Sequence, residues 1–72
     1  MLNTNYIPEM VAAQKFINEH KDDIALNNLL TRARDRNIMH SDRWSMIYDY
    51  MTEHYPEVTG FIITGLTYSC EA

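Results

Sequence analysis

The sequence predicts an all-α fold: a small bundle of three helices followed by a short apolar C-terminal element. Three observations predict it. Apolar residues recur at helical spacing in three segments, a change of phase separates the first segment from the second, and a proline closes the third. Because a chain of 72 residues is too short to hold two cores, we expect residues 1–72 to form a single small helical domain.

The first helix is predicted over residues 8–21, after an irregular N-terminal arm at residues 1–7. Pro8 suits the first position of a helix, where its missing N–H costs nothing, and Glu9 follows in the first turn. At about 100° per residue, the polar residues that follow fall on one side of the helix and the apolar ones on the other. The apolar stripe comprises Met10, Ala13, Phe16, Ile17 and His20.

The second helix is predicted over residues 23–36, with the apolar stripe Leu26, Leu29, Leu30 and Ala33. This stripe is out of phase with the first at about 3.6 residues per turn, so one straight helix would direct its two halves to different neighbours. A break near Asp22 is therefore expected, with Asp22 or Asp23 as the N-cap carboxylate. Arginines occupy the last turns, where the helix dipole favours cations, and Asn37 is expected to end the helix in a left-handed conformation.

The third helix is predicted over residues 42–55, with Ser41 as its cap and Pro56 as its stop. Its solvent side is expected to carry Asp42, Ser45, Asp49, Thr52 and Glu53. The core of the three-helix bundle is predicted to comprise Phe16, Ile17, Leu26, Leu29, Leu30, Trp44, Ile47, Tyr48 and Met51.

Residues 57–70 form an apolar tail that allows two interpretations. Val58, Phe61, Ile62, Gly65 and Leu66 follow the spacing of a helix. The same segment is rich in glycine, threonine and β-branched residues, which favour a strand. A short fourth helix is the interpretation adopted, with a strand or hairpin as the alternative.

The composition argues against several classes of protein. The formal net charge is −4, with six basic residues against ten acidic ones, whereas non-specific nucleic-acid binding relies on lysine and arginine. The most apolar segment, residues 58–68, is shorter than the roughly 20 residues of a spanning helix, and no secretory leader is evident. Cys70 is the only cysteine, which excludes an internal disulfide and suits a reducing compartment. We therefore expect a cytoplasmic protein without membrane association.

No catalytic, cofactor-binding or metal-binding residue is predicted, and the chain is not expected to be an enzyme. The three histidines, His20, His40 and His54, lack the i, i+4 pairing that places two ligands on one helical face. His20 is expected to be a satisfied histidine at the edge of the first stripe. The sequence contains neither a nucleophile elbow nor a glycine-rich phosphate loop.

Two patterns offer alternatives that involve nucleic acid. The segment "RDRNIMH", from Arg34 to His40, resembles the Arg-x4–6-His spacing of the helical HEPN ribonucleases. That resemblance implies an arginine and a histidine that act on an RNA backbone at a dimer interface. The second and third helices together also suggest a helix-turn-helix, but its recognition helix would carry one arginine against Asp42, Asp49 and Glu53.

The function predicted by elimination is that of a small acidic module that binds another protein as a regulator, adaptor or inhibitor. Small proteins of this class are common among phages and mobile elements. Tryptophan, tyrosine and arginine dominate interface hot spots, and methionine is enriched at interfaces. The residues predicted to bind the partner are Arg36, Arg43, Met46 and Tyr50.

A homodimer is also predicted, because so small a domain has little interior in which to bury the whole apolar tail. An exposed remainder would form an apolar patch of the kind that marks an interface. The residues predicted for this self-association are Phe61, Ile62, Ile63 and Leu66.

Overall fold

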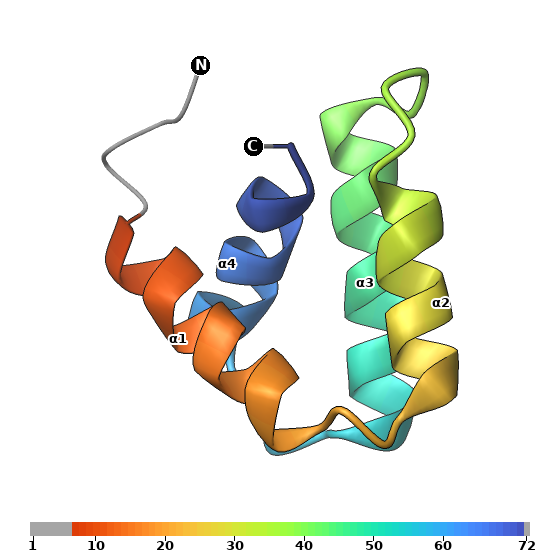
Figure 1. Ribbon diagram of the computed structural model, residues 1–72. Helices are drawn as coiled ribbons and strands as arrows, with labels where there is room; N and C mark the ends of the chain where they lie inside the picture. The colour runs from red at the N-terminus through yellow and green to blue at the C-terminus, as the bar shows by residue number, and fades with distance from the viewer. Residues whose placement is uncertain (1–6, 72) are drawn as a thin grey trace.

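The computed structural model describes residues 7–71, in which helices are the only regular secondary structure (Figure 1). In chain order these are α1 (Ile7–Glu19), α2 (Ile24–Ala33), α3 (His40–His54) and α4 (Gly60–Glu71). The predicted all-α class is confirmed, and the tail that could be helix or strand is a fourth helix. The irregular arm was predicted at residues 1–7. Ile7 instead begins α1, and residues 1–6 lie outside the described residues.

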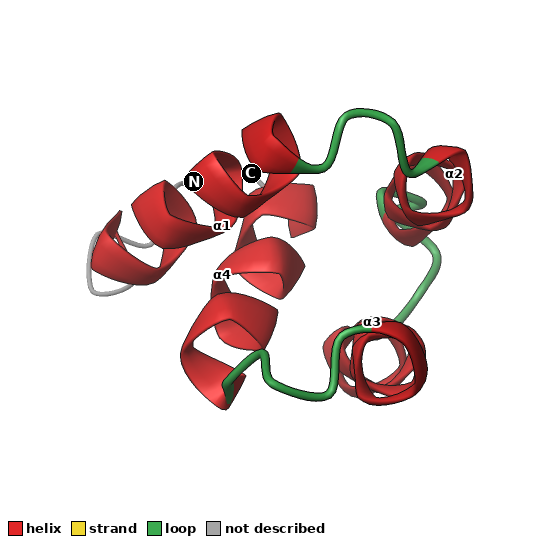
Figure 2. Ribbon diagram, turned by 90° about the horizontal axis from the view of Figure 1, so that it is seen from below, coloured by secondary structure: helices red, strands yellow, loops and turns green. Residues whose placement is uncertain are grey.

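The four helices form two pairs. Helices α2 and α3 lie side by side and antiparallel, and both are seen end-on in Figure 2. Helix α4 returns beside α3, and α1 lies across α4 on the other side of the molecule. Among the described helices, the backbone of α1 comes close to that of α4 alone, while the backbone of α4 comes close to all three others. The C-terminal helix therefore joins the two pairs.

The predicted break between the first two helices is confirmed, and Asp23 is its cap. The Asp23 carboxylate accepts a hydrogen bond of 2.9 Å from the backbone N–H of Leu26, which the first turn of α2 would otherwise leave unpaired. Helix α1 ends at Glu19, and a tight turn follows in which the N–H of Asp23 donates to the carbonyl of His20 at 3.0 Å.

Two predicted helix ends are wrong. Asn37 does not end α2 in a left-handed conformation, since no non-glycine residue within 7–71 has a positive φ; instead α2 ends at Ala33, with Arg34 as the C-cap. Ser41 does not cap α3 either, because the helix already begins at His40 and its N-cap is Met39, whose side chain accepts no capping hydrogen bond. The physical reason is that the side chain of Arg43 organises the intervening loop, as described below.

One apolar core lies between the two pairs. Of the predicted core residues, Ile17 and Trp44 are partly buried. The assignment of Tyr48 to the core is wrong, because 43% of this residue is exposed. The other predicted core residues are buried: Phe16, Leu26, Leu29, Leu30, Ile47 and Met51. Small or tail residues complete the core: Ala13, Ala33, Ile63, Leu66 and Cys70.

Helices α1 and α4 approach so closely that Gly65 has no room for a side chain. A Cβ atom added at Gly65 would overlap the carbonyl oxygen of Glu9 and lie 2.5 Å from its carbon and 2.9 Å from the Cβ of Ala13. Glycine inside a helix costs about 1 kcal/mol relative to alanine. Here that cost is offset by the packing that direct backbone contact between α1 and α4 permits.

Candidate functional site

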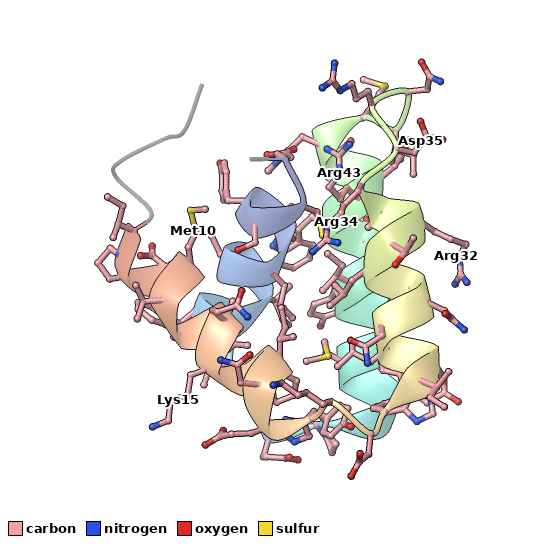
Figure 3. All side chains as sticks on the ribbon, in the orientation of Figure 1. Met10, Lys15, Arg32, Arg34, Asp35 and Arg43 are labelled. Carbon is pink, nitrogen blue, oxygen red and sulfur yellow. The ribbon has the colours of Figure 1, made fainter. Side chains whose placement is uncertain are left out.

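Arg43, one of the four residues predicted to bind a partner, is buried inside the protein, with 5% of it exposed. Its Nη1 donates to Glu71 Oε2 at 2.6 Å, and its Nη2 donates to the carbonyls of Asp35 and Ile38 at 2.8 and 3.0 Å. Its Nε donates to the carbonyl of Ala33, at the end of α2. Figure 3 shows Arg43 at the loop end of α3, beside Asp35. The guanidinium therefore holds together the end of α2, the α2–α3 loop and the end of α4.

Tyr50, another of the four, is joined to the cap of α2. Its hydroxyl lies 2.9 Å from both carboxylate oxygens of Asp23, and the hydroxyl of Tyr55 donates to the same carboxylate at 2.6 Å. Asp23 thus ties the start of α2 to the end of α3. Burial first, and then the hydrogen bond to Asp23, raise the pKa of Tyr50 to about 12. Both tyrosines therefore stay protonated as donors at neutral pH.

The carboxyl group of Asp23 makes folding sensitive to acid. The hydroxyl of Tyr55 first, then the N–H of Leu26, lower the pKa of Asp23 below its ordinary value of 3.8, against the opposing effect of burial. Because the folded pKa is below the unfolded one, the stabilisation is fully present above pH 3.8 and is lost as the pH falls through the folded value.

We therefore expect Asp23→Asn to flatten the acid limb of the stability curve. Asparagine still accepts the capping bond from Leu26 but does not titrate. The variant should therefore lose less stability than the wild type between about pH 5 and about pH 2, the range over which such a carboxylate takes up its proton. Urea unfolding at several pH values measures this. Asp22→Asn, at the exposed neighbouring position, is the control and should keep the wild-type slope. Equal slopes for all three proteins would show that Asp23 is not the responsible group.

The other two predicted partner-binding residues lie apart. Met46 is partly buried and packs against the core, one turn before Tyr50 on α3. Arg36 is exposed in the α2–α3 loop. The structure therefore brings Met46 and Tyr50 together, but places Arg43 inside and Arg36 in a separate loop. Whether a partner contacts these residues stays a prediction.

An aromatic surface that the sequence did not predict runs along α3 towards α4. Trp44 and Tyr48 stack with ring centroids 4.9 Å apart and an interplanar angle of 17°. One turn earlier, the ring of His40 lies 5.0 Å from that of Tyr68 in α4. We call His40, Trp44, Tyr48 and Tyr68 the aromatic face. Trp44 packs against the core, whereas Tyr48 covers Trp44 from outside.

An acidic row lies beside the aromatic face on the outer side of α3. We define it as Asp42, Asp49 and Glu53, which are all exposed, as predicted from the pattern. Exposed hydroxyl residues, Ser45 and Thr52, separate the row from Tyr48 around the helix. The sequence has no lysine or arginine from Trp44 to Cys70, and Arg43 is buried. The outer side of α3 is therefore both aromatic and uniformly negative.

The tail residues predicted for self-association divide between the inside and the outside of the fold. Ile63 and Leu66 are buried in the core of this chain. Ile62 is partly buried, and 49% of Phe61 is exposed. Only Phe61 and Ile62 therefore remain available to a second copy, and the homodimer stays a prediction.

The histidines are accounted for by contacts within the chain. His20 bonds to the carbonyl of Phe16 at 2.7 Å and stacks on its ring, which confirms it as a satisfied edge residue. His40, half of the pair that resembles the HEPN motif, bonds through Nδ1 to Glu71 at 2.7 Å, while Arg34 caps α2. The region from 7 to 71 contains no cluster of histidine, cysteine or carboxylate groups that could hold a metal ion. The ribonuclease interpretation remains untested.

Helices α2 and α3 differ from a helix-turn-helix in their arrangement. Such motifs cross at roughly 90–120°, so that the second helix can enter a groove. Here the two helices run side by side, as both views show (Figures 1 and 2). Nothing else tests the nucleic-acid interpretation.

The candidate site is therefore a surface, the aromatic face together with the acidic row on α3. Within residues 7–71, no helix is long and apolar enough to cross a membrane. The stacked rings and exposed carboxylates of this surface can contact another molecule. Comparison of the chain with family models, with curated proteins and with solved structures found no match.

Proposed function

We propose that this protein is a small acidic module that binds another protein through the outer side of α3 and acts as a regulator, adaptor or inhibitor. The observation that carries the proposal is the stack of Trp44 and Tyr48, in which Tyr48 is half-exposed and lies outside the core. The proposal places the protein in the cytoplasm, where the single buried thiol of Cys70 stays reduced.

The stack has the properties of an interface hot spot. Tryptophan and tyrosine supply large, rigid contact area and are the residues most often responsible for binding energy. Tyr48 makes no hydrogen bond with another described side chain, unlike Tyr50 and Tyr55, which hold Asp23. An exposed ring that the fold does not need for a polar contact is available to a partner.

Truncation of Tyr48 tests the proposal. We expect Tyr48→Ala to remain folded, with a loss of about 1 kcal/mol or less, because a half-exposed ring has little packing to lose. The variant should nevertheless fail to capture the partner in an affinity pull-down. Phe61→Ala is the matched control, since it removes a similarly exposed ring from α4. It should retain the partner, and capture of the same partner by Tyr48→Ala would refute the proposal.

Phe61→Ala also tests the second part of the proposal, a homodimer that associates through the exposed side of the tail. The exposed rings and side chains of Phe61 and Ile62 are the available contacts. In analytical ultracentrifugation, the wild type should then have a larger mass than Phe61→Ala. A wild-type mass equal to one chain at all concentrations would exclude the dimer.

A further inference from the structure

We infer that the partner surface that docks on α3 is basic and rich in arginine. This inference rests on the proposed function and deepens it, because it names the chemistry of the partner. Three features of the structure carry it: the continuity of the acidic row with the aromatic face, the lack of a nearby cation, and the stacked rings at the edge.

The carboxylates and the rings lie on one continuous side of α3. With about 100° between successive residues, Asp49 lies about 100° around the helix from Tyr48, and Asp42 and Glu53 lie within about 40° of Asp49. The hydroxyl groups of Ser45 and Thr52 lie between the rings and the carboxylates, and no bulky side chain interrupts the surface. A single bound segment can therefore contact both.

Within residues 7–71, no cation forms an ion pair with the acidic row. Arg43 is the only basic residue of α3 apart from its terminal histidines, and its charge is used inside the protein by Glu71. The exposed cations lie on other elements: Lys15 and Lys21 at α1 and its turn, and Arg32, Arg34 and Arg36 at the end of α2. In Figure 3, Arg32 projects away from α2 on the side opposite α4. A partner with positive charge would neutralise the carboxylates of the row, whereas the phosphates of a nucleic acid would be repelled by them.

The stacked rings favour arginine over lysine. A guanidinium is planar, stacks on aromatic faces and binds carboxylates through two parallel hydrogen bonds. Tyr48 presents an exposed ring across the small side chains of Ser45 and Thr52 from the acidic row, so one arginine can stack while another pairs with a carboxylate. Lysine can pair with the row but stacks less favourably.

Trp44 provides the measurement, because it is the only tryptophan and lies in the aromatic face. Its fluorescence can be followed during titration with an arginine-rich peptide, a lysine-rich peptide and a glutamate-rich peptide of equal length. Two triple variants separate the effect of the acidic row from the effect of net charge. The row variant is Asp42→Asn/Asp49→Asn/Glu53→Gln. The control variant, Glu19→Gln/Asp22→Asn/Glu57→Gln, changes exposed carboxylates outside α3. Each removes three negative charges, which changes the formal net charge from −4 to −1.

We expect the row variant to bind the arginine-rich peptide about tenfold more weakly than the wild type, and the control variant to bind it nearly as well. The wild type should prefer arginine to lysine by roughly two- to fivefold, and Tyr48→Ala should remove that preference. Circular dichroism establishes that each variant is folded. Equal losses in the two triple variants would mean that only net charge matters, which would overturn the inference.

Other occupants would also be recognised. Binding of a single-stranded oligonucleotide that depends on the row would overturn the inference in favour of nucleic acid. A mass that rises with concentration for the wild type but not for the row variant would assign the row to a second copy, whose own Arg32, Arg34 and Arg36 are exposed. A partner whose capture depends on Tyr48, with no peptide binding at the row, would reject this inference and leave the proposed function intact.

Discussion

Replacing Gly65 with alanine is expected to destabilise the protein by at least about 3 kcal/mol, the upper range for overpacking in a core. The added methyl group would meet the backbone of Glu9, which cannot turn away as a flexible side chain can, and the Cβ of Ala13. Helices α1 and α4 would have to move apart along their whole contact. Because a chain of this length has only about 3–5 kcal/mol of stability, the variant should be largely unfolded at room temperature. Chemical denaturation followed by circular dichroism measures the change.

Gly60→Ala is the matched control for this prediction. Gly60 is the first residue of α4, and a Cβ there would meet nothing within 4 Å. Alanine also has the higher helix propensity, by about 1 kcal/mol in a helix interior. The control should therefore be as stable as the wild type or slightly more stable. If Gly65→Ala were as stable as Gly60→Ala, the close crossing of α1 and α4 would be incorrect.

Arg43→Met is expected to cost about 3 kcal/mol, although methionine preserves much of the apolar volume. The substitution removes the donors from two loop carbonyls, from the carbonyl of Ala33 and from Glu71, and the Ala33 carbonyl is left buried. An unsatisfied buried acceptor costs about 1–3 kcal/mol by itself. Thermal unfolding should show a lower Tm by roughly 12 °C or more for a domain of this size.

Arg36→Met makes the same substitution at an exposed position of the same loop and should change stability by less than about 0.5 kcal/mol. The pair also separates the two roles considered for Arg43. If Arg43→Met stayed as stable as Arg36→Met and lost a partner, Arg43 would be a docking residue and its internal contacts would be incidental.

The helices could be predicted from the sequence because each of them rests on local physics. The phase change after His20 and the carboxylate of Asp23 together identify the break, and Pro56 marks the end of α3. The ends near Asn37 and Ser41 could not be predicted, since they depend on Arg43, which lies beyond both in the chain. Its guanidinium binds the loop carbonyls that a left-handed asparagine or a serine cap would otherwise organise.

The candidate surface lies on the helix that carries three of the four predicted partner-binding residues, but it comprises different side chains for a physical reason. Periodicity assigns Tyr48 to the core because it falls inside the apolar stripe, but the stripe alone does not show how far α4 reaches around α3. Tyr50 looked available because its hydrogen-bond partner, Asp23, is distant in the sequence. The signal that could have been used is the Trp44–Tyr48 spacing, since the outermost ring of an i, i+4 pair at a stripe edge tends to be exposed.

The close backbone approach of α1 to α4 has a consequence for the order of folding. Helices α2 and α3 are adjacent in the chain and can pair as soon as both have left the ribosome, whereas α1 must wait until residues 60–71 have been synthesised. During that interval Ala13 lacks the helix that α1 crosses, and Phe16 can pack only against residues such as Tyr55, at the end of α3. Of the four helices, α1 is therefore made first and is the last to gain its main packing partner.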